Sequence, residues 1–547
     1  MEQPLFSSRL YFFLFLFLGI VYIPGLFVPL MDNDAAHHAN IALRMSLTGD
    51  YLNLIDHNGD YLDKPHFLFW TSALSYHIFG VTSFAYKFPS FLFTMLGVYS
   101  IYRLGKLLYN NETGRLAALI AASSFGFLLT NNDVRMDAIL VACVSLSTWQ
   151  LVALFNNKKT VFVFGAALGL AIGFMTKGVV GFILPFIALF FYALYKKEWK
   201  TFLHFKWVFL FFLFFLFISP VLYCYYQQFN LHPEKIIRGK NNINGLAYIF
   251  LNQSVDRLGG KMGTEGDPLF FFHTFFWFFA PWGIITLVSF FSRIRSFLRV
   301  KKEWLTIGSF LLLLLLISFS KYQLPHYLLL AAPWAAVFSA DYFLSFKKTP
   351  QNTRLFFGTQ VFISLLILVF FLLLCYFFFS TSFLIIGGVL FILLFVFVYK
   401  LPAILIKKSI LVSVFFIGFL FLFLSCFFYP LLLRYQAGKT LVDLSAAIAK
   451  PKDVYFLKNV FSSSYTFYSA SLRQEFNPDD SILLKKPFWL YYDKKSETMV
   501  DSLGLIIGRR FMVSDYEITR LKKNLILPKT RPDALLVVFL VEVLGKK

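Results

Sequence analysis

The sequence predicts an α-helical, multi-pass membrane protein with about 13 transmembrane helices that ends in a small extracytoplasmic α/β domain. Three observations support this fold class. Of the 547 residues, 58% are hydrophobic and only 15% are charged, whereas soluble domains keep about 25% charged residues. Long apolar segments recur up to residue 430, and the composition changes after that point. A cytosolic globular enzyme, a disordered chain and a disulfide-stapled secreted module are therefore excluded.

Each predicted transmembrane helix is an apolar run of about 20 residues, which is long enough to cross a bilayer. The predicted spans lie near residues 10–30, 84–102, 116–131, 138–156, 160–176, 179–195, 207–228, 270–292, 304–320, 323–345, 355–379, 383–399 and 409–430. The first span is followed by polar sequence instead of a small-residue cleavage site. We therefore expect a retained anchor, not a removable signal peptide.

The basic residues between the spans predict the orientation of the chain. They gather in alternate loops, at 103–115, 158–159, 196–206, 293–302, 347–354 and 400–408. Such loops face the cytoplasm, which places the N-terminus inside and two long loops, 31–83 and 229–269, outside. Because the net charge of +22 is spread between hydrophobic segments and forms no continuous basic face, we expect no nucleic-acid partner.

From about residue 435 the apolar runs shorten and acidic residues mix with basic ones. Alternating segments at 454–457, 488–492 and 534–541 are typical of strands, with helix-like stretches between them. We therefore predict two domains. Residues 1–434 form the transmembrane domain, and residues 435–547 form an α/β domain on the outer face.

The first outer loop opens with two carboxylates directly after an apolar span. Asp32 and Asp34 follow Leu30, so at least one of them lies at the membrane surface, where desolvation raises its basicity. A general base fits this position. Residues 35–48 have helical spacing, and capping that helix is the alternative role for one of the two carboxylates.

Two further short motifs place acids and cations at the outer ends of spans. The first motif is Asp63-Lys64-Pro65. Lys64 suits the binding of a phosphate, while Asp63 suits the binding of a metal ion or the positioning of Lys64. The alternative is that the two form a plain surface ion pair. In the second, Arg135 and Asp137 belong to a very short turn before a predicted span. The alternative for Asp137 is a helix cap.

Several cations lie at outer positions where the positive-inside rule predicts few. Lys177 and Lys321 occupy tight outer turns, and Arg257 opens a Gly-rich stretch in the second outer loop. Such cations suit an anionic head group, with snorkelling to the interface as the alternative for the two lysines. Eight of the nine histidines, including His38, also fall on this side. Long outer loops that simply hold more polar residues would explain this as well.

In this order the motifs resemble those of the polyprenyl-phosphate-dependent GT-C glycosyltransferases, the branch with the lipid A aminoarabinose transferase and relatives of the protein O-mannosyltransferases. The matching residues are Asp34, Gly49-Asp50, Asn58-Gly59, Asp63-Lys64-Pro65, Arg135-Met136-Asp137, Thr176-Lys177-Gly178 with Pro185, Pro281-Trp282, and Lys321 with Pro325, Tyr327 and Pro333. The resemblance in architecture covers the first 430 residues.

The resemblance implies a bacterial inner-membrane enzyme that transfers a sugar, with inversion, from polyprenyl phosphate to an outer acceptor. It implies catalytic roles for Asp34 and Asp137, and donor-phosphate binding by Lys64, Arg257, Lys177 and Lys321. Asp32, Arg135, His38 and Tyr327 are secondary candidates. The acceptor is expected to be lipid A, lipopolysaccharide or a related envelope glycan, with a protein hydroxyl as the alternative.

The chain departs from the family pattern at three places. Ala35 follows Asp34 where the family has a second acid, so a second carboxylate would come from Asp32 or Asp137. Asp63 replaces the commoner Glu before Lys-Pro, and residues 250–256 lack the His that often helps to hold a metal. A divalent metal at Asp63 is therefore an open expectation.

Two other classes of protein compete with this function. A transporter of anionic lipids or solutes usually carries ionisable residues on broken helices at the membrane midplane. Here the spans are nearly free of charge and no half repeats the other, which disfavours transport. A non-catalytic assembly protein, whose outer domain recruits a partner, is the third hypothesis.

Overall fold

The computed structural model describes residues 4–157, 159–237, 239–252, 267–296, 302–346, 350–479 and 486–546. In this part of the chain, ten helices are long and apolar enough to cross a membrane. They are α1 (Ser8–Phe27), α4 (Ser83–Leu108), α7 (Met136–Asn157), α8 (Thr160–Lys177), α9 (Val179–Lys196), α10 (Lys206–Tyr225), the segment Pro325–Ser345 that ends in α16 (Ala332–Ser345), α17 (Pro350–Phe378), α18 (Thr381–Lys400) and α19 (Leu405–Phe423). A multi-pass helical membrane protein is thereby confirmed.

The predicted number of 13 spans is not reached. The segment near 116–131 is a bent pair, α5 (Asn111–Ala122) and α6 (Phe125–Asn132), which meet at 50° and bring the count to 11 if taken as one span. The segment near 270–292 is divided between α13 (Phe270–Phe278) and α14 (Gly283–Arg295), and the one near 304–320 becomes α15 (Leu305–Ser318), of 14 residues. At 1.5 Å per residue these three helices are each shorter than a bilayer core of about 30 Å. Their apolar composition predicted that they are spans, but each helix is too short to cross the membrane.

The first outer segment, 31–83, is folded and not an open loop. It contains helix α2 (Asp34–Thr48), a short hairpin of β1 (Ile55–Asp56) and β2 (Gly59–Asp60), and helix α3 (Phe67–Phe79). The expected helix at 35–48 is confirmed as α2. Ala, Ile, Leu and Met side chains on one face of α2 are buried, and α2 packs against α3. This packing holds the first turn of α2 in a fixed position.

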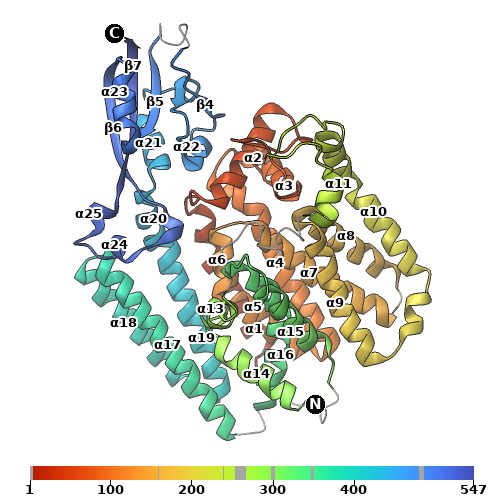
Figure 1. The fold of residues 1–547 in the computed structure, drawn as a ribbon. Coiled ribbons are helices and arrows are strands. Elements are labelled where there is room, and N and C mark those ends of the chain that lie inside the picture. The colour runs from red at the N-terminus through yellow and green to blue at the C-terminus, as the bar shows by residue number, and fades with distance from the viewer. Residues whose placement is uncertain are drawn as a thin grey trace.

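In the second outer segment the described residues form one short helix, α11 (Gly245–Ala247), flanked by π-helical turns at Tyr226–Asn230 and Tyr248–Asn252. The Gly-rich stretch that begins at Arg257 lies outside the described residues. Figure 1 shows α2, α3 and α11 at the same end of the molecule as the C-terminal strands.

The C-terminal region contains a five-stranded sheet in the order β4-β3-β5-β7-β6. Its strands are β3 (Val454–Phe456), β4 (Gln474–Glu475), β5 (Phe488–Asp493), β6 (Leu505–Asp515) and β7 (Leu536–Lys546). Its helices, with the short ones that precede it, are α20 (Tyr429–Leu432), α21 (Ala437–Ser445), α22 (Ser463–Tyr468), α23 (Glu497–Ser502), α24 (Lys523–Ile526) and α25 (Arg531–Ala534). Strand β3 runs parallel to its two neighbours, β4 and β5. Strand β7 runs antiparallel to its two neighbours, β5 and β6.

Three of these strands were predicted and two were not. The segments at 454–457 and 488–492 form β3 and β5, and the segment at 534–541 begins with α25 before it becomes β7. Strand β6 lacks the expected pattern because most of its side chains are at least partly exposed and its pairing with β7 is irregular between Ile506 and Arg510. Strand β4 has only two residues, which is too short for any periodicity.

Polar contacts fasten this C-terminal region to the start of the first outer segment. The Asp32 carboxylate accepts hydrogen bonds from the Ser462 and Ser464 hydroxyls, at 2.8 and 2.9 Å, and from the backbone N–H of Ser463 at 3.0 Å. The Gln436 amide donates to the Leu30 carbonyl at 2.8 Å, and its oxygen accepts from the Asp32 N–H at 2.6 Å. The C-terminal region is therefore bound to Asp32, two residues before Asp34.

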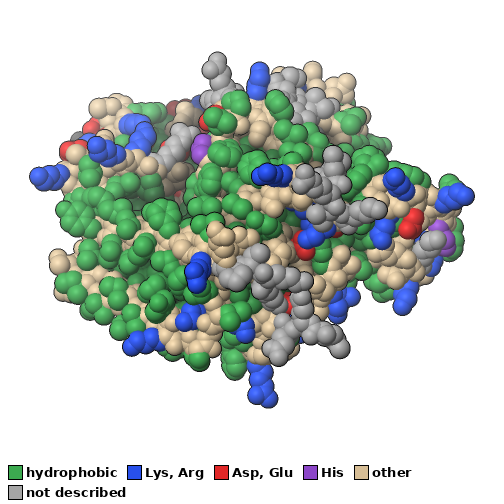
Figure 2. Space-filling view, turned by 90° about the horizontal axis from the view of Figure 1, so that it is seen from below, with side chains coloured by type: hydrophobic (Ala, Val, Ile, Leu, Met, Phe, Trp, Pro, Cys, Tyr) green, Lys and Arg blue, Asp and Glu red, His purple; other side chains and the backbone are tan. Residues whose placement is uncertain are grey.

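The opposite end of the molecule has a different surface. Figure 2 shows Lys and Arg side chains spread over this face among hydrophobic ones, with few acidic side chains in view. A buried network stabilises it: Arg293 donates to Asp341 at 3.0 Å and contacts Glu303 at 3.3 Å. The side chains of Arg293 and Glu303 are less than 10% exposed, so the basic end is firmly packed.

Candidate active site

Side chains from distant parts of the sequence line one cavity of about 270 Å³, called the Asp34 cavity below. It lies where the first turn of α2, the start of α7, the end of α8 and the segment before α16 meet. Eight residues predicted from the sequence line it: Asp34, His38, Asp63, Lys64, Arg135, Asp137, Lys177 and Tyr327. Packing thus brings together motifs that are as much as 293 residues apart, as the numbers of Asp34 and Tyr327 show.

Asp34 occupies the first turn of α2 and does not cap it. The cap is Asn33, whose side-chain oxygen accepts a hydrogen bond from the Ala35 N–H at 2.8 Å. The alternative role of Asp32 or Asp34 as a cap is therefore wrong. The Asp34 side chain is 57% exposed, so a substrate can reach it.

Arg135 holds the Asp34 carboxylate from one side. Its Nη1 donates to Asp34 Oδ2 at 2.9 Å, and its Nε donates to Asp133 Oδ2 at 3.0 Å. Packing around Asp34 acts to raise the pKa of its carboxyl, but the opposing charges of Arg135 and Lys64, among others, hold that pKa below its ordinary value. Asp34 is therefore ionised at neutral pH, as a general base must be.

Asp137 forms a buried ion pair at one side of the cavity. Lys177 Nζ lies 2.7 Å from Asp137 Oδ1, and the two side chains are 7% and 3% exposed. His326 Nε2 lies 3.5 Å from Asp137 Oδ2, and the Lys177 ammonium sits 4.6 Å from the centre of the Tyr327 ring. Lys177 is thus buried inside the protein, and snorkelling to the interface is wrong for it. Its charge is offset by Asp137.

Asp63 and Lys64 also form a pair, with Lys64 Nζ 2.8 Å from Asp63 Oδ2. Their side chains are 22% and 13% exposed, so the pair faces the cavity and is not a plain surface pair. The buried His38 ring lies beside them, with its Nε2 3.3 Å from the Tyr61 hydroxyl. Burial lowers the pKa of His38 to about 3, so its imidazole is neutral at physiological pH.

Two predicted residues in the described part of the chain, Asp32 and Lys321, do not line the Asp34 cavity, and a third lies outside that part. Asp32 is engaged by Ser462, Ser463 and Ser464, as described above, and so serves the contact with the C-terminal region. Lys321 is exposed and directly precedes Tyr322, which lines the cavity. Arg257 lies outside the described residues, so its phosphate role stays a prediction.

The structure adds residues that the sequence did not single out. His326 contacts Asp137, and Tyr61 contacts His38. A signal for His326 was present, because it stands between the motif residues Pro325 and Tyr327. Tyr61 gave no signal, since one aromatic residue in a polar loop is common in any sequence.

The donor set of the cavity does not fit a divalent metal. Asp34 is paired with Arg135, and Asp63 is paired with Lys64, so each carboxylate near the expected site already faces a cation. Among the described residues, metal-binding side chains gather within 4.8 Å of one another at His37, Asp56 and His57, and Asp63 is not part of that group. We therefore assign no metal ion to Asp63.

One further hollow adjoins the Asp34 cavity, and a second hollow adjoins the first. One, of about 520 Å³, shares Asp34, Arg135 and His326 with it and continues to Trp277. The other, here called the apolar groove, also has a volume of about 520 Å³ and includes Trp277. The rest of its lining is almost entirely hydrophobic, with side chains from α13, α14, α17 and α19. Trp277 therefore belongs both to a polar hollow and to an apolar groove beside the spanning helices α17 and α19.

The sequence and fold were compared with known proteins. Residues 63–224 match the family described as dolichyl-phosphate-mannose-protein mannosyltransferase. An undecaprenyl phosphate-alpha-4-amino-4-deoxy-L-arabinose arabinosyl transferase of Pseudomonas aeruginosa (strain UCBPP-PA14) is 24% identical over 283 residues, 50% of this chain and 46% of that protein. An uncharacterised protein of Aquifex aeolicus (strain VF5) is 25% identical over 343 residues, 61% of this chain and 64% of that protein. The match thus spans about half the length of the arabinosyl transferase.

The fold match covers the whole molecule. The crystal structure of ArnT from Cupriavidus metallidurans bound to undecaprenyl phosphate aligns with a TM-score of 0.76 at 14% identity, over 98% of each chain. The apo crystal structure of the same protein gives a TM-score of 0.72. The chain therefore has the fold of ArnT. The resemblance to the polyprenyl-phosphate-dependent GT-C glycosyltransferases is confirmed, with the fold closely similar to that of ArnT.

Proposed function

We propose that this protein is an integral-membrane glycosyltransferase that moves a sugar from a polyprenyl phosphate, such as undecaprenyl phosphate, to an acceptor at the outer face of the membrane. The observation that carries the proposal is the placement of Asp34. An ionised, accessible carboxylate lies in a cavity that also contains Lys64 and continues, by way of Trp277, towards an apolar groove. This arrangement supplies a base, a cation and a surface for a lipid chain in one place.

The proposed reaction is a single displacement at the anomeric carbon. The acceptor oxygen forms a bond to that carbon while the bond from the carbon to the phosphate oxygen breaks. The proton of the acceptor goes to Asp34, and polyprenyl phosphate leaves with the bonding electron pair. Because the acceptor attacks from the side opposite the leaving phosphate, the anomeric configuration inverts.

Asp34 is prepared for this role by Arg135. The guanidinium binds Asp34 Oδ2, whereas Oδ1 accepts no hydrogen bond from the described residues. One oxygen is thus held in place and the other is open to an acceptor hydroxyl. Arg135 is itself fixed by Asp133, so we assign it as a positioning residue for the base.

The charges of the cavity bear on how the leaving phosphate is stabilised. The lining contains three carboxylates, at Asp34, Asp63 and Asp137, and three cations, at Lys64, Arg135 and Lys177. These charges balance, so the developing negative charge on the phosphate calls for further cations. Arg257 and Lys321, which the sequence predicts for this role, would supply them beside Lys64.

The apolar groove suits the polyprenyl chain of the donor. Its lining includes Phe276, Ile367 and Leu420, and hydrocarbon packed against such side chains forms no unpaired polar contact. Since Trp277 lines both this groove and the hollow that contains Asp34, a phosphate at the polar end and a lipid chain in the groove would lie on neighbouring surfaces.

The proposed acceptor is lipid A, lipopolysaccharide or a related envelope glycan, as the resemblance to the branch with the lipid A aminoarabinose transferase implies; the Pseudomonas aeruginosa relative is named for its undecaprenyl-phosphate sugar donor. Transfer to a protein hydroxyl is the second candidate, favoured by the family described as a protein mannosyltransferase, which matches residues 63–224. We also propose an inner-membrane location, with the N-terminus inside and residues 435–547 as an extracytoplasmic domain. The basic face in Figure 2, opposite the sheet, supports this orientation.

The proposed function is tested by mass spectrometry of envelope lipids and glycoproteins from a strain that lacks the gene. Loss of one sugar modification, with accumulation of its polyprenyl-phosphate sugar, would identify acceptor and donor together. Restoration by the wild-type chain and not by Asp34→Asn would assign the transfer to this cavity. An envelope with every modification intact would contradict the proposal.

A further inference from the structure

A second polar cavity, of about 190 Å³, lies beside the Asp34 cavity and contains none of the residues assigned to sugar transfer above. Its lining comes from α2, from the β1–β2 hairpin and from residues 461–475 of the C-terminal region. His37 lines both cavities. The second cavity is therefore a junction between the first outer segment, the C-terminal region and the proposed active site.

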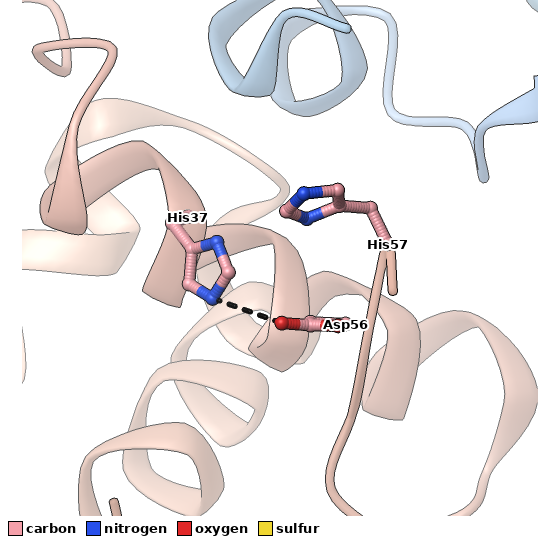
Figure 3. Close-up of side chains that lie close together, drawn as sticks. All are labelled: His37, Asp56 and His57. Atoms are coloured by element: carbon pink, nitrogen blue, oxygen red, sulfur yellow. Dashed lines mark ion pairs between the residues drawn. The ribbon is translucent and has the colours of Figure 1, made fainter. Parts of the chain in front are cut away.

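Three metal-binding side chains meet at this junction. The ligand atoms of His37, Asp56 and His57 all lie within 4.8 Å of one another, and His37 Nε2 is 3.5 Å from Asp56 Oδ2. Figure 3 shows the His37 ring directed at the Asp56 carboxylate, with the His57 ring facing both from the hairpin. Two imidazoles and one carboxylate are a common ligand set for a divalent transition metal.

The spacing is close to that of a bound ion. Zinc bonds of about 2.0–2.1 Å in a tetrahedral site place neighbouring ligand atoms about 3.3 Å apart. The separation of His37 and Asp56, 3.5 Å, already agrees with this. His57 belongs to the tight turn between β1 and β2, and its ligand atom lies within 4.8 Å of those of His37 and Asp56, so a bound ion would draw it closer by up to about 1.5 Å.

Neighbouring groups hold two of the ligands in place, as metal sites require. The backbone N–H of Asn58 donates to Asp56 Oδ1 at 2.7 Å. His57 stacks on Phe461 of the C-terminal region, with ring centres 4.3 Å apart. A simple surface pair between His37 and Asp56 would explain neither the third ligand nor its support.

We propose that His37, Asp56 and His57 bind one Zn²⁺ ion, with a fourth coordination position open to the cavity between α2 and the C-terminal region. The ion cross-links the β1–β2 hairpin to α2 one turn after Asp34. Because His57 packs on Phe461, the same ion stabilises the contact of the hairpin with the C-terminal region. Its role is to position these elements, and it takes no part in bond making.

The test is direct metal binding to the full-length protein. After treatment with a chelator and removal of any affinity tag, the purified protein is titrated with Zn²⁺ and analysed by mass spectrometry of bound metal. We expect one equivalent of zinc in the wild type. His57→Ala and the near-isosteric Asp56→Asn should each weaken binding by about tenfold or more.

His77→Ala is the matched control, because His77 is an outer-face histidine that bonds to Tyr51 and is not one of the three ligands. It should bind zinc like the wild type. Replacement of zinc by Co²⁺ should give visible absorption bands that His57→Ala abolishes and His77→Ala keeps. Absence of bound zinc in the wild type, or equal zinc binding by wild type, His57→Ala and Asp56→Asn, would overturn the proposal. Because the test measures zinc binding and not sugar transfer, its result is independent of the proposed function.

Discussion

The Lys177 ammonium lies 2.7 Å from the Asp137 carboxylate, and both side chains are almost completely buried. Two residues to which the family resemblance gives different roles, a catalytic residue and a phosphate ligand, are thus partners of each other. A buried charge is strongly destabilising when its partner is removed, because nothing else compensates for its desolvation. The pair therefore fixes α7 to α8 beside Asp34, and its direct contact with substrate stays a prediction.

Lys177→Met should leave Asp137 as an unpaired buried charge and destabilise the protein by about 3–5 kcal/mol. The double variant Lys177→Met with Asp137→Leu removes both charges and should recover most of that loss. Thermal unfolding in one detergent measures both variants. If Lys177→Met unfolds at the wild-type temperature, the pair is not a structural one.

Arg135→Gln should change the pH dependence of sugar transfer. Arg135 holds the pKa of Asp34 below its ordinary value against the opposing effect of packing, so its removal raises that pKa. The base acts in its ionised form, and the acid limb of the kcat/KM profile should therefore move to higher pH. Arg115→Gln is the control, since Arg115 contacts Ser8 on the first helix. An unmoved acid limb would show that Arg135 does not hold the pKa of Asp34 below its ordinary value.

Asp32→Asn should act on stability and leave the chemistry intact. The Asp32 carboxylate accepts three hydrogen bonds from residues 462–464, and hydrogen bonds to a charged group contribute about 1.5–3 kcal/mol. Limited proteolysis of the C-terminal region should become faster in Asp32→Asn and stay unchanged in Asp34→Asn. The opposite pattern would mean that the roles of the two carboxylates are exchanged.

His66 should make the protein sensitive to acid. Burial lowers the pKa of His66 to about 4, below the value near 6.5 of an unfolded chain. Its contribution to stability is complete above about pH 6.5 and is lost as the pH falls towards 4, because only the unfolded state takes up the proton readily. The loss between pH 7.5 and 5 amounts to about 2 kcal/mol.

Thermal unfolding temperatures at these two pH values measure this effect. His66→Gln should show a smaller decrease than the wild type, whereas His77→Gln should behave like the wild type because its Nε2 bonds to Tyr51 on an exposed surface. An equal decrease in wild type and His66→Gln would assign the acid sensitivity to other groups.

Much of the fold followed from composition because hydrophobic runs and turn residues are local signals. The helix α2 and the strands β3 and β5 were predicted for this reason. The helices α13 and α15 were mistaken for spans, since apolar composition does not say where a helix ends. Strand β6 was missed because its mostly exposed residues carry no alternating pattern.

The residues of the site were predicted from the sequence, but the contacts between them were not. Motif order placed Asp34, Lys64 and Asp137 on one side of the membrane, and the structure brings them to one cavity. The pairing of Asp137 with Lys177, and of Asp32 with Ser462, depends on tertiary packing across 40 and 430 residues of sequence. Neither contact has a signature within a short segment, so neither could be predicted.

The central claim is that Asp34 is the base of a sugar transfer from polyprenyl phosphate. The most direct measurement is the rate of transfer from a labelled polyprenyl-phosphate sugar in proteoliposomes that contain wild-type protein, Asp34→Asn or the control Asp443→Asn, whose residue pairs with Lys439 on an exposed helix. We predict that Asp34→Asn folds normally and lowers kcat by about 10²–10⁴-fold, with Asp443→Asn unchanged. Transfer by Asp34→Asn at the wild-type rate would contradict the account.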